Sequence, residues 1–167
     1  SVIANFQYGQ ADVLLNSEGQ KWTPSVVTMR QDGSLAFGQE AKENFDEERS
    51  IRSIKRILGS GERVPFVGQT LRTEQIATML FTKLKNDAQK AINEPFTKAV
   101  VTIPANSKGL ARHATKLCAG AAGLQVLTLI NEPTAAAICY GLNAQQDQTI
   151  LVYDFGGGTL DVTVLRI

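Results

Sequence analysis

The sequence holds few of the residues that carry most metal and nucleophilic chemistry: two cysteines, one histidine and one tryptophan among 167 residues. Cys118 and Cys139 form no CxxC motif, so neither a zinc site nor a disulfide framework is indicated. Both lie in alanine-rich, helix-like stretches and are expected to be buried. A reducing, cytoplasmic compartment is the default, although an organelle stays open because the chain does not begin with methionine. His113 has no histidine or cysteine nearby and is expected at the surface.

The chain also lacks a charge excess and a run of membrane length. Its 17 basic and 16 acidic residues give a net charge of +1, which points to neither nucleic acid nor a membrane surface as partner. The best apolar stretch, Leu117–Ile130, is too short for a membrane span and contains glycines, Gln125 and Thr128. Apolar and charged fractions of 43% and 20% are those of an ordinary globular domain.

The most informative stretch is the end of the chain, where two strand-like runs flank three consecutive glycines. Residues Thr149–Tyr153 form an apolar run, and period-2 alternation and β-branched residues on both sides of the glycines predict a β-hairpin. Glycines 156–158 leave backbone N–H groups free to surround a phosphate. Asp154 and Asp161 supply the oxygen ligands that suit a hydrated Mg²⁺. A plain glycine turn with two solvated aspartates is the alternative; a Walker loop or dinucleotide fingerprint would need a following helix.

The first half of the chain is predicted to open with short antiparallel strands, with Trp22 as a packing anchor between them. The expected strands are Val2–Tyr8, Asp12–Leu15, Ser25–Met29 and Leu35–Phe37. Short helices follow at Gln39–Phe45 and Ser50–Leu58, the second capped by Ser50. Residues 62–71 are expected to be irregular, and Thr73 is expected to cap a long amphipathic helix that ends near Ile92.

The second half is predicted to alternate strands and helices. Strands are expected at Lys98–Ile103 and Leu127–Ile130. Between them, Ser107 is expected to cap a helix that reaches Ala122. The core face of this helix is predicted to comprise Leu110, Ala114, Leu117, Cys118 and Ala121. Pro133 suits the first position of the next helix, which places Glu132 at a strand-to-helix junction, where open sheets of this type bind ligands.

Two strings of the sequence resemble the 70-kDa heat-shock chaperones (Hsp70/DnaK type): VYDFGGGTLDVTVL at 152–165 and INEPTAAAICYGL at 130–142. The string SIKRILG at 53–59 is similar to the same family. The resemblance implies an α/β fold, namely an actin-like ATPase (ribonuclease H-like) lobe with a mixed β-sheet and packed helices. Residues 1–167 would then be a partial nucleotide-binding domain, lobe I, without the first phosphate hairpin or lobe II.

The resemblance also implies roles for individual residues. Backbone N–H groups of Gly156, Gly157 and Gly158 would hold the phosphates of ATP or ADP, and Thr159 would contact the γ-phosphate. Asp154, Asp161 and Glu132 would position Mg²⁺, mostly through water, and a K⁺ ion. Lys55 would steady the attacking water, so the implied catalytic set is Lys55, Glu132, Asp154 and Thr159.

Implied partners are unfolded client polypeptides, a J-domain co-chaperone and a nucleotide-exchange factor, and the family relays nucleotide state through Pro104 and Arg112. Because only half of a two-lobed site would be present, the isolated segment is expected to be inactive. Two alternatives remain. One is a non-catalytic, chaperone-like interaction module, and the other is a sugar-kinase-like phosphotransferase, which the string NEPTAAA at 131–137 argues against.

Overall fold

The computed structural model describes residues 1–141, 147, 149–155 and 160–166. The elements in chain order are β1 (Ala4–Gln7), β2 (Gln10–Val13), β3 (Val26–Met29), β4 (Leu35–Phe37), α1 (Gly38–Glu43), β5 (Ser50–Arg52), the 3₁₀ helix η1 (Ile54–Arg56), β6 (Arg63–Phe66), β7 (Gln69–Arg72), α2 (Thr73–Ile92), β8 (Lys98–Ile103), α3 (Gly109–Ala121), β9 (Gln125–Asn131), α4 (Glu132–Gly141), β10 (Thr149–Phe155) and β11 (Leu160–Arg166). The fold is therefore mixed α/β.

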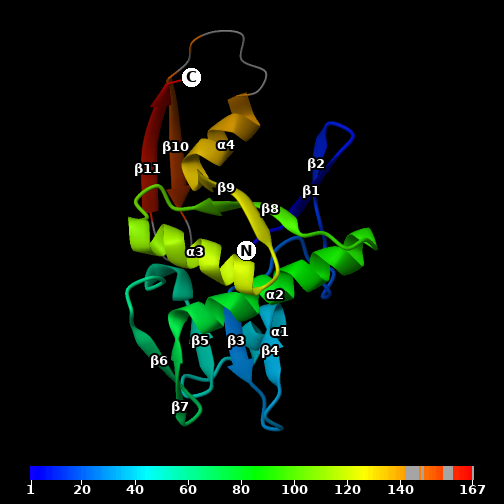
Figure 1. Cartoon of the computed structure of the whole chain (residues 1–167), viewed down its shortest axis with the longest axis vertical. Coiled ribbons are helices and arrows are strands. Elements are labelled where there is room, and N and C mark those ends of the chain that lie inside the picture. Colours follow the sequence, from blue (N-terminus) through cyan, green and yellow to red (C-terminus); the bar gives the residue numbers. More distant parts are fainter. Residues whose placement is uncertain (142–146, 148, 156–159, 167) are drawn as a thin grey trace.

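The strands of the described residues are divided among five small sheets. Four are antiparallel: β1–β2, β4–β3–β5, β6–β7 and β10–β11. The fifth pairs β8 with β9 in parallel, with α3 as the crossover between them. In Figure 1, α2 and α3 cross the middle of the molecule, with sheet β4–β3–β5 and α1 below them and β8, β9 and α4 above; hairpin β1–β2 projects to one side. No helix in this described part is both long and apolar enough to cross a membrane.

The main hydrophobic core lies between α2 and the strands below it. Ile76 of α2 is 1% exposed and packs with Val27 of β3, Ile51 of β5, Ile54 of η1 and Phe66 of β6. The long amphipathic helix predicted to end near Ile92 is confirmed, with its buried stripe against these strands. Burial of each such side chain stabilises the fold by roughly 1.5–3 kcal/mol, so α2 is the element on which the lower sheets are assembled.

The predicted helix at Ser50–Leu58 is wrong. Ser50 and Ile51 instead belong to strand β5, where they pair with Thr28 and Val27 of β3. The 3₁₀ turn η1 follows after Ser53, whose φ is 59°. A strand gives Ile51 both ladder hydrogen bonds and a place in the core, which outweighs the helical spacing of the apolar residues.

The irregular structure predicted for residues 62–71 is also wrong, because β6 and β7 form a hairpin there. Its two-residue turn, Val67 and Gly68, has φ values of 47° and 71°. Positive φ at both central positions matches the right-handed twist of the flanking strands, so the short turn closes the hairpin despite the unfavourable valine.

The caps predicted for the two longest helices, Thr73 and Ser107, are wrong. The residue that precedes α2 is Arg72, whose backbone N–H donates to Gln75 Oε1 at 2.9 Å, and Thr73 is the first, fully buried, helical residue. Lys108 precedes α3, and no side chain caps that end. Helix α2 therefore begins at Thr73, the residue expected to cap it, whereas α3 begins at Gly109, two residues after Ser107.

The exposure of several apolar residues also departs from the sequence prediction. Helix α3 packs on α2, and the buried face of α3 carries the small residues Ala114, Cys118 and Ala119. The leucines expected on that core face, Leu110 and Leu117, are 73% and 56% exposed. Small residues let the two helices approach closely, so the leucines are displaced to the rim of the contact.

Trp22, expected as a packing anchor, is 60% exposed. Cys118 is buried as predicted, and its burial raises the pKa of its thiol. Cys139 is exposed, so the prediction that it is buried is wrong.

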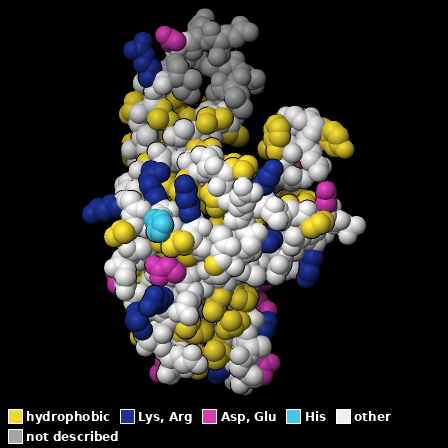
Figure 2. Space-filling model, viewed as in Figure 1, with side chains coloured by type: hydrophobic (Ala, Val, Ile, Leu, Met, Phe, Trp, Pro, Cys, Tyr) yellow, Lys and Arg dark blue, Asp and Glu magenta, His cyan; other side chains and the backbone are white. Residues whose placement is uncertain are grey.

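His113 is exposed as predicted. Figure 2 shows it on the surface with lysine and arginine side chains around it.

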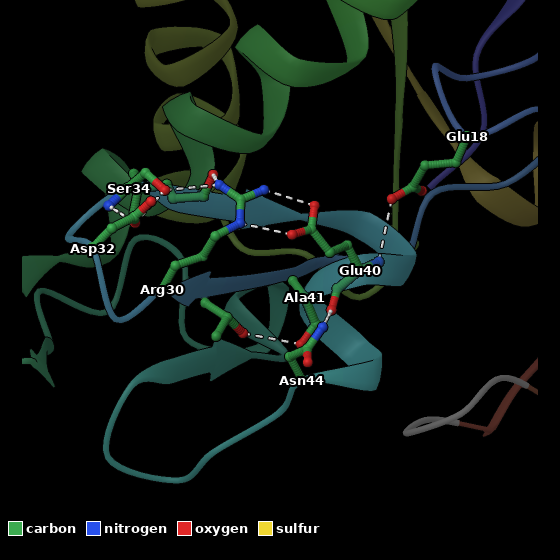
Figure 3. A network of polar contacts seen from close by, with 9 residues as sticks. Glu18, Arg30, Asp32, Ser34, Glu40, Ala41 and Asn44 are labelled. Carbon is green, nitrogen blue, oxygen red and sulfur yellow. Dashed lines mark hydrogen bonds and ion pairs between the residues drawn. The ribbon is translucent and has the colours of Figure 1, made fainter.

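A polar network fixes α1 against its neighbours (Figure 3). Arg30, directly after β3, donates hydrogen bonds from Nε and Nη2 to the two oxygens of the Glu40 carboxylate in α1, each at 2.7 Å. The Glu18 carboxylate accepts hydrogen bonds from the backbone N–H groups of Gln39 and Glu40, both at 3.2 Å. The short helix is thus attached at its start by two segments that lie outside it.

Candidate functional site

The structure brings together two of the predicted catalytic residues, Lys55 and Glu132. Lys55 Nζ lies 2.5 Å from Glu132 Oε1, across a sequence separation of 77 residues. The Lys55 side chain is 57% exposed and that of Glu132 is 24% exposed, so the pair is open to solvent on the lysine side. An ion pair with this exposure contributes little stability. The pair therefore matters less for stability than for the place in which it holds an ammonium next to a carboxylate.

Lys55 reaches this position because η1 is anchored by its apolar residues. Ile54 is 5% exposed in the main core, and Ile57 packs against the same cluster. The backbone N–H of Ile57 donates to the Ile54 carbonyl at 3.2 Å and closes the tight turn. With Ile54 turned into the core, the next side chain along the turn points outward, toward the start of α4.

Glu132 is placed by the parallel strand pair. Strand β9 ends at Asn131 and α4 begins at the next residue, so Glu132 stands at the carboxyl end of a strand, as the sequence predicted. Arg112 of α3 donates from Nη2 to Asn131 Oδ1 at 2.7 Å and from Nε to the Ser107 carbonyl at 3.2 Å. A side chain of α3 thus holds the residue immediately before the carboxylate.

Asp154 and Asp161 face each other directly across hairpin β10–β11. Two like charges at opposed positions of an antiparallel pair destabilise it unless a cation lies between them. The two carboxylates are oxygen ligands of the kind that Mg²⁺ takes, and their role in binding it stays a prediction. Glycines 156–158 and Thr159, the predicted phosphate-binding bend, lie outside the described residues.

Glu132 does not join the two aspartates in a direct metal site. Among the described residues, no three carboxylate, imidazole or thiol side chains come close enough together to bind a metal. Mg²⁺ positioning by Asp154, Asp161 and Glu132 through water stays a prediction, and the residues present fit that arrangement better than direct three-fold ligation.

Sequence reasoning missed the exposed outer face of the hairpin. Three cross-strand pairs on this face are apolar: Leu151 with Val164, Tyr153 with Val162, and Phe155 with Leu160. All six side chains are between 51% and 76% exposed, whereas their neighbours on the face toward α4 are mostly half-buried. Figure 2 shows hydrophobic surface around α4 and this hairpin. Alternation in the sequence predicts that the hairpin has two faces, but it does not say that the face turned away from α4 is the apolar, exposed one.

Sequence reasoning also missed the Arg112–Asn131 hydrogen bond and a close backbone contact of Gly59 with α3. Neither follows from a local pattern, because each joins segments that the fold alone brings together. The one related signal in the sequence is Gly59 itself, which directly follows the helix predicted at Ser50–Leu58.

The fold is mixed α/β, and the site residue Glu132 lies where strand β9 ends and helix α4 begins, the usual position of ligand sites in open α/β sheets. The family model described as "Hsp70 protein" matches residues 1–67 and 60–167. These two ranges together cover the whole chain, so the chain belongs to the Hsp70 family.

Proposed function

We propose that this chain is the first-lobe part of an actin-like nucleotide-binding domain that binds and hydrolyses ATP in an Hsp70-type chaperone. The observation that carries the proposal is the Lys55–Glu132 ion pair, in which two residues assigned to the site by family resemblance meet across 77 residues of sequence. A chance surface pair would not be expected to join these two residues.

The chemistry required for phosphoryl transfer is positioning together with neutralisation of charge. The Lys55 ammonium, 57% exposed and next to the buried Ile54, provides a positive charge that can reach an oxygen of a bound phosphate. Asp154 and Asp161 would hold Mg²⁺ through water, and this ion would neutralise phosphate charge. Glu132 orients Lys55 and accepts a hydrogen bond from it.

The coupled partners belong to the same proposal. Membership of the Hsp70 family supports client polypeptides, a J-domain co-chaperone and a nucleotide-exchange factor as partners, with ATP or ADP, Mg²⁺ and K⁺ as ligands. The proposed compartment is a reducing one such as the cytoplasm, in which Cys118 and the exposed Cys139 stay as thiols.

The test is the substitution Lys55→Ala in the full-length product of the gene that encodes this chain. Steady-state ATPase turnover should fall by a factor on the order of 100, because a charge that acts in the transition state is lost. ATP affinity, measured by calorimetry, should stay close to the wild-type value. Lys42→Ala, which removes an exposed lysine of α1, is the matched control. Near-normal turnover of the Lys55→Ala protein would remove Lys55 from the catalytic set.

A further inference from the structure

Gly59, four residues after Lys55, lies directly on the backbone of α3. Its φ is +78°, and a Cβ at this position would lie 2.8 Å from the Ala111 nitrogen and 2.8 Å from the carbonyl carbon and oxygen of Leu110. These are main-chain atoms of a helix, which cannot move aside as a flexible side chain can. The loop that follows η1 therefore rests on the first turn of α3 only because this residue has no side chain.

The same turn of α3 also holds the other partner of the ion pair. Arg112, the residue after Ala111, donates to Asn131 Oδ1 at 2.7 Å, and Asn131 immediately precedes Glu132. One short stretch of helix, residues 110–112, thus contacts the loop that follows Lys55 and the strand end that precedes Glu132. Together with the core packing of Ile54, these two contacts bear on where the two charged groups lie.

We propose that Gly59 is a positioning residue that places Lys55 on Glu132 by allowing the Lys55 loop to lie against α3. The consequence for catalysis rests on the proposed function, since only an ATPase would lose rate when Lys55 is displaced. The geometric statement stands independently of it. A displacement of about 1 Å at a reacting group can reduce a rate by a factor on the order of 100.

Gly61 provides a matched control two residues away. Its φ of +79° equals that of Gly59 within a degree, yet a Cβ added to it would meet none of the described residues within 4 Å. Asparagine tolerates positive φ better than other residues with a side chain. Gly59→Asn and Gly61→Asn therefore carry a similar conformational cost, and only the first brings a Cβ into contact with the helix backbone.

The experiment measures the contact itself in the 167-residue chain, without nucleotide. A carbodiimide activates a carboxylate as an O-acylisourea, and a neighbouring amine displaces it to form an amide, so the carbodiimide leaves as the corresponding urea. The Lys55–Glu132 cross-link is then quantified by mass spectrometry after proteolysis. We expect the wild-type chain and the Gly61→Asn chain to give the same yield. The Gly59→Asn chain should give a yield lower by about tenfold, because the amide forms only from groups held in contact. Lys55→Ala shows the background.

Equal cross-link yields in the two asparagine variants would overturn the proposal. Circular dichroism of each variant provides the second measurement. If Gly59→Asn abolishes folding while Gly61→Asn does not, the contact holds the whole domain and not specifically the ion pair, and the proposal is again wrong. ATPase turnover of the full-length protein separates the two ideas: a lost cross-link with unchanged turnover supports the positioning role of Gly59 and contradicts the catalytic role proposed for Lys55.

Discussion

At the scale of single residues, the stabilising effect of the exposed ion pair between Arg30 and Glu40 depends on pH. The two hydrogen bonds from Arg30 hold the pKa of the Glu40 carboxyl below its usual value of 4.5. The hydroxyl and the backbone N–H of Ser34 do the same for Asp32, whose usual value is 3.8. A carboxyl whose folded-state pKa is lowered stabilises the fold above its unfolded-state pKa, and this contribution is lost as the pH falls through the folded-state value.

Glu40→Gln should therefore unfold at a lower urea concentration than wild type at about pH 7, and this difference should shrink between about pH 5 and pH 3. The glutamine removes the negative charge that Arg30 pairs with but keeps the size of the side chain. Glu47→Gln, in the exposed loop before β5, is the control and should change little at either pH. A gap between Glu40→Gln and wild type that stays the same at about pH 3 would contradict the charge argument.

At this scale, the sequence predicted residues that belong to a recognisable motif. It did not predict residues that matter because of a contact between distant segments. Lys55 and Glu132 were both assigned to the site from short strings, but nothing in those strings said that the two would touch. Arg112 donates to Asn131, and Gly59 lies on α3; both depend on the packing of α3 against segments distant in sequence. Such contacts are properties of the assembled fold.

At the scale of elements, α1 depends on a carboxylate supplied by another segment. The residue before the helix, Phe37, makes no capping hydrogen bond. Glu18, in the loop between β2 and β3, accepts instead from the N–H groups of Gln39 and Glu40 and places a negative charge at the positive end of the helix. A helix of six residues is too short to be stable alone, so this contact and the Arg30 pair fix where it forms.

Glu18→Ala should lower the free energy of unfolding by about 0.5 to 1 kcal/mol, the range for loss of an exposed N-cap. Glu18→Gln should lower it less, because the amide oxygen still accepts a hydrogen bond while the charge is lost. Chemical denaturation of both variants beside Glu47→Ala gives the comparison. The capping role is wrong if Glu18→Ala is no less stable than that control.

Elements with strong local patterns were predicted with nearly correct bounds, and β8 and β4 have the predicted ones. Helix α2 was predicted because its apolar residues recur at helical spacing over its whole length. The segment from Ser50 to Leu58 was misjudged because Ile51 and Ile54 also fit a helical face. A strand and a 3₁₀ turn bury both of them, and the choice is decided by pairing with β3, which local spacing does not contain.

At the scale of the whole molecule, burial is uneven. The main core joins α2 to β3, β5, η1 and β6. Hairpin β1–β2 pairs only with itself among the described strands, and Phe6 and Tyr8 on it are 72% and 100% exposed. It projects from the body of the molecule in Figure 1. A two-stranded hairpin with little packing is at best marginally stable, so the molecule should open in parts and not all at once.

Native-state hydrogen exchange should resolve this order. The amides of α2 near Ile76 and of β3 near Val27, both about 1% exposed, should exchange slowest, through global unfolding. The amides of β1 and β2 should exchange far faster, through local opening. Ile76→Ala should cost roughly 2–5 kcal/mol and speed exchange in α2 and β3 together, because both belong to one cooperative unit. The rates in β1–β2 should stay unchanged, since that hairpin already opens without the core. Equal protection in β1–β2 and α2 would show that the molecule unfolds as one unit and that packing of the hairpin has been underestimated.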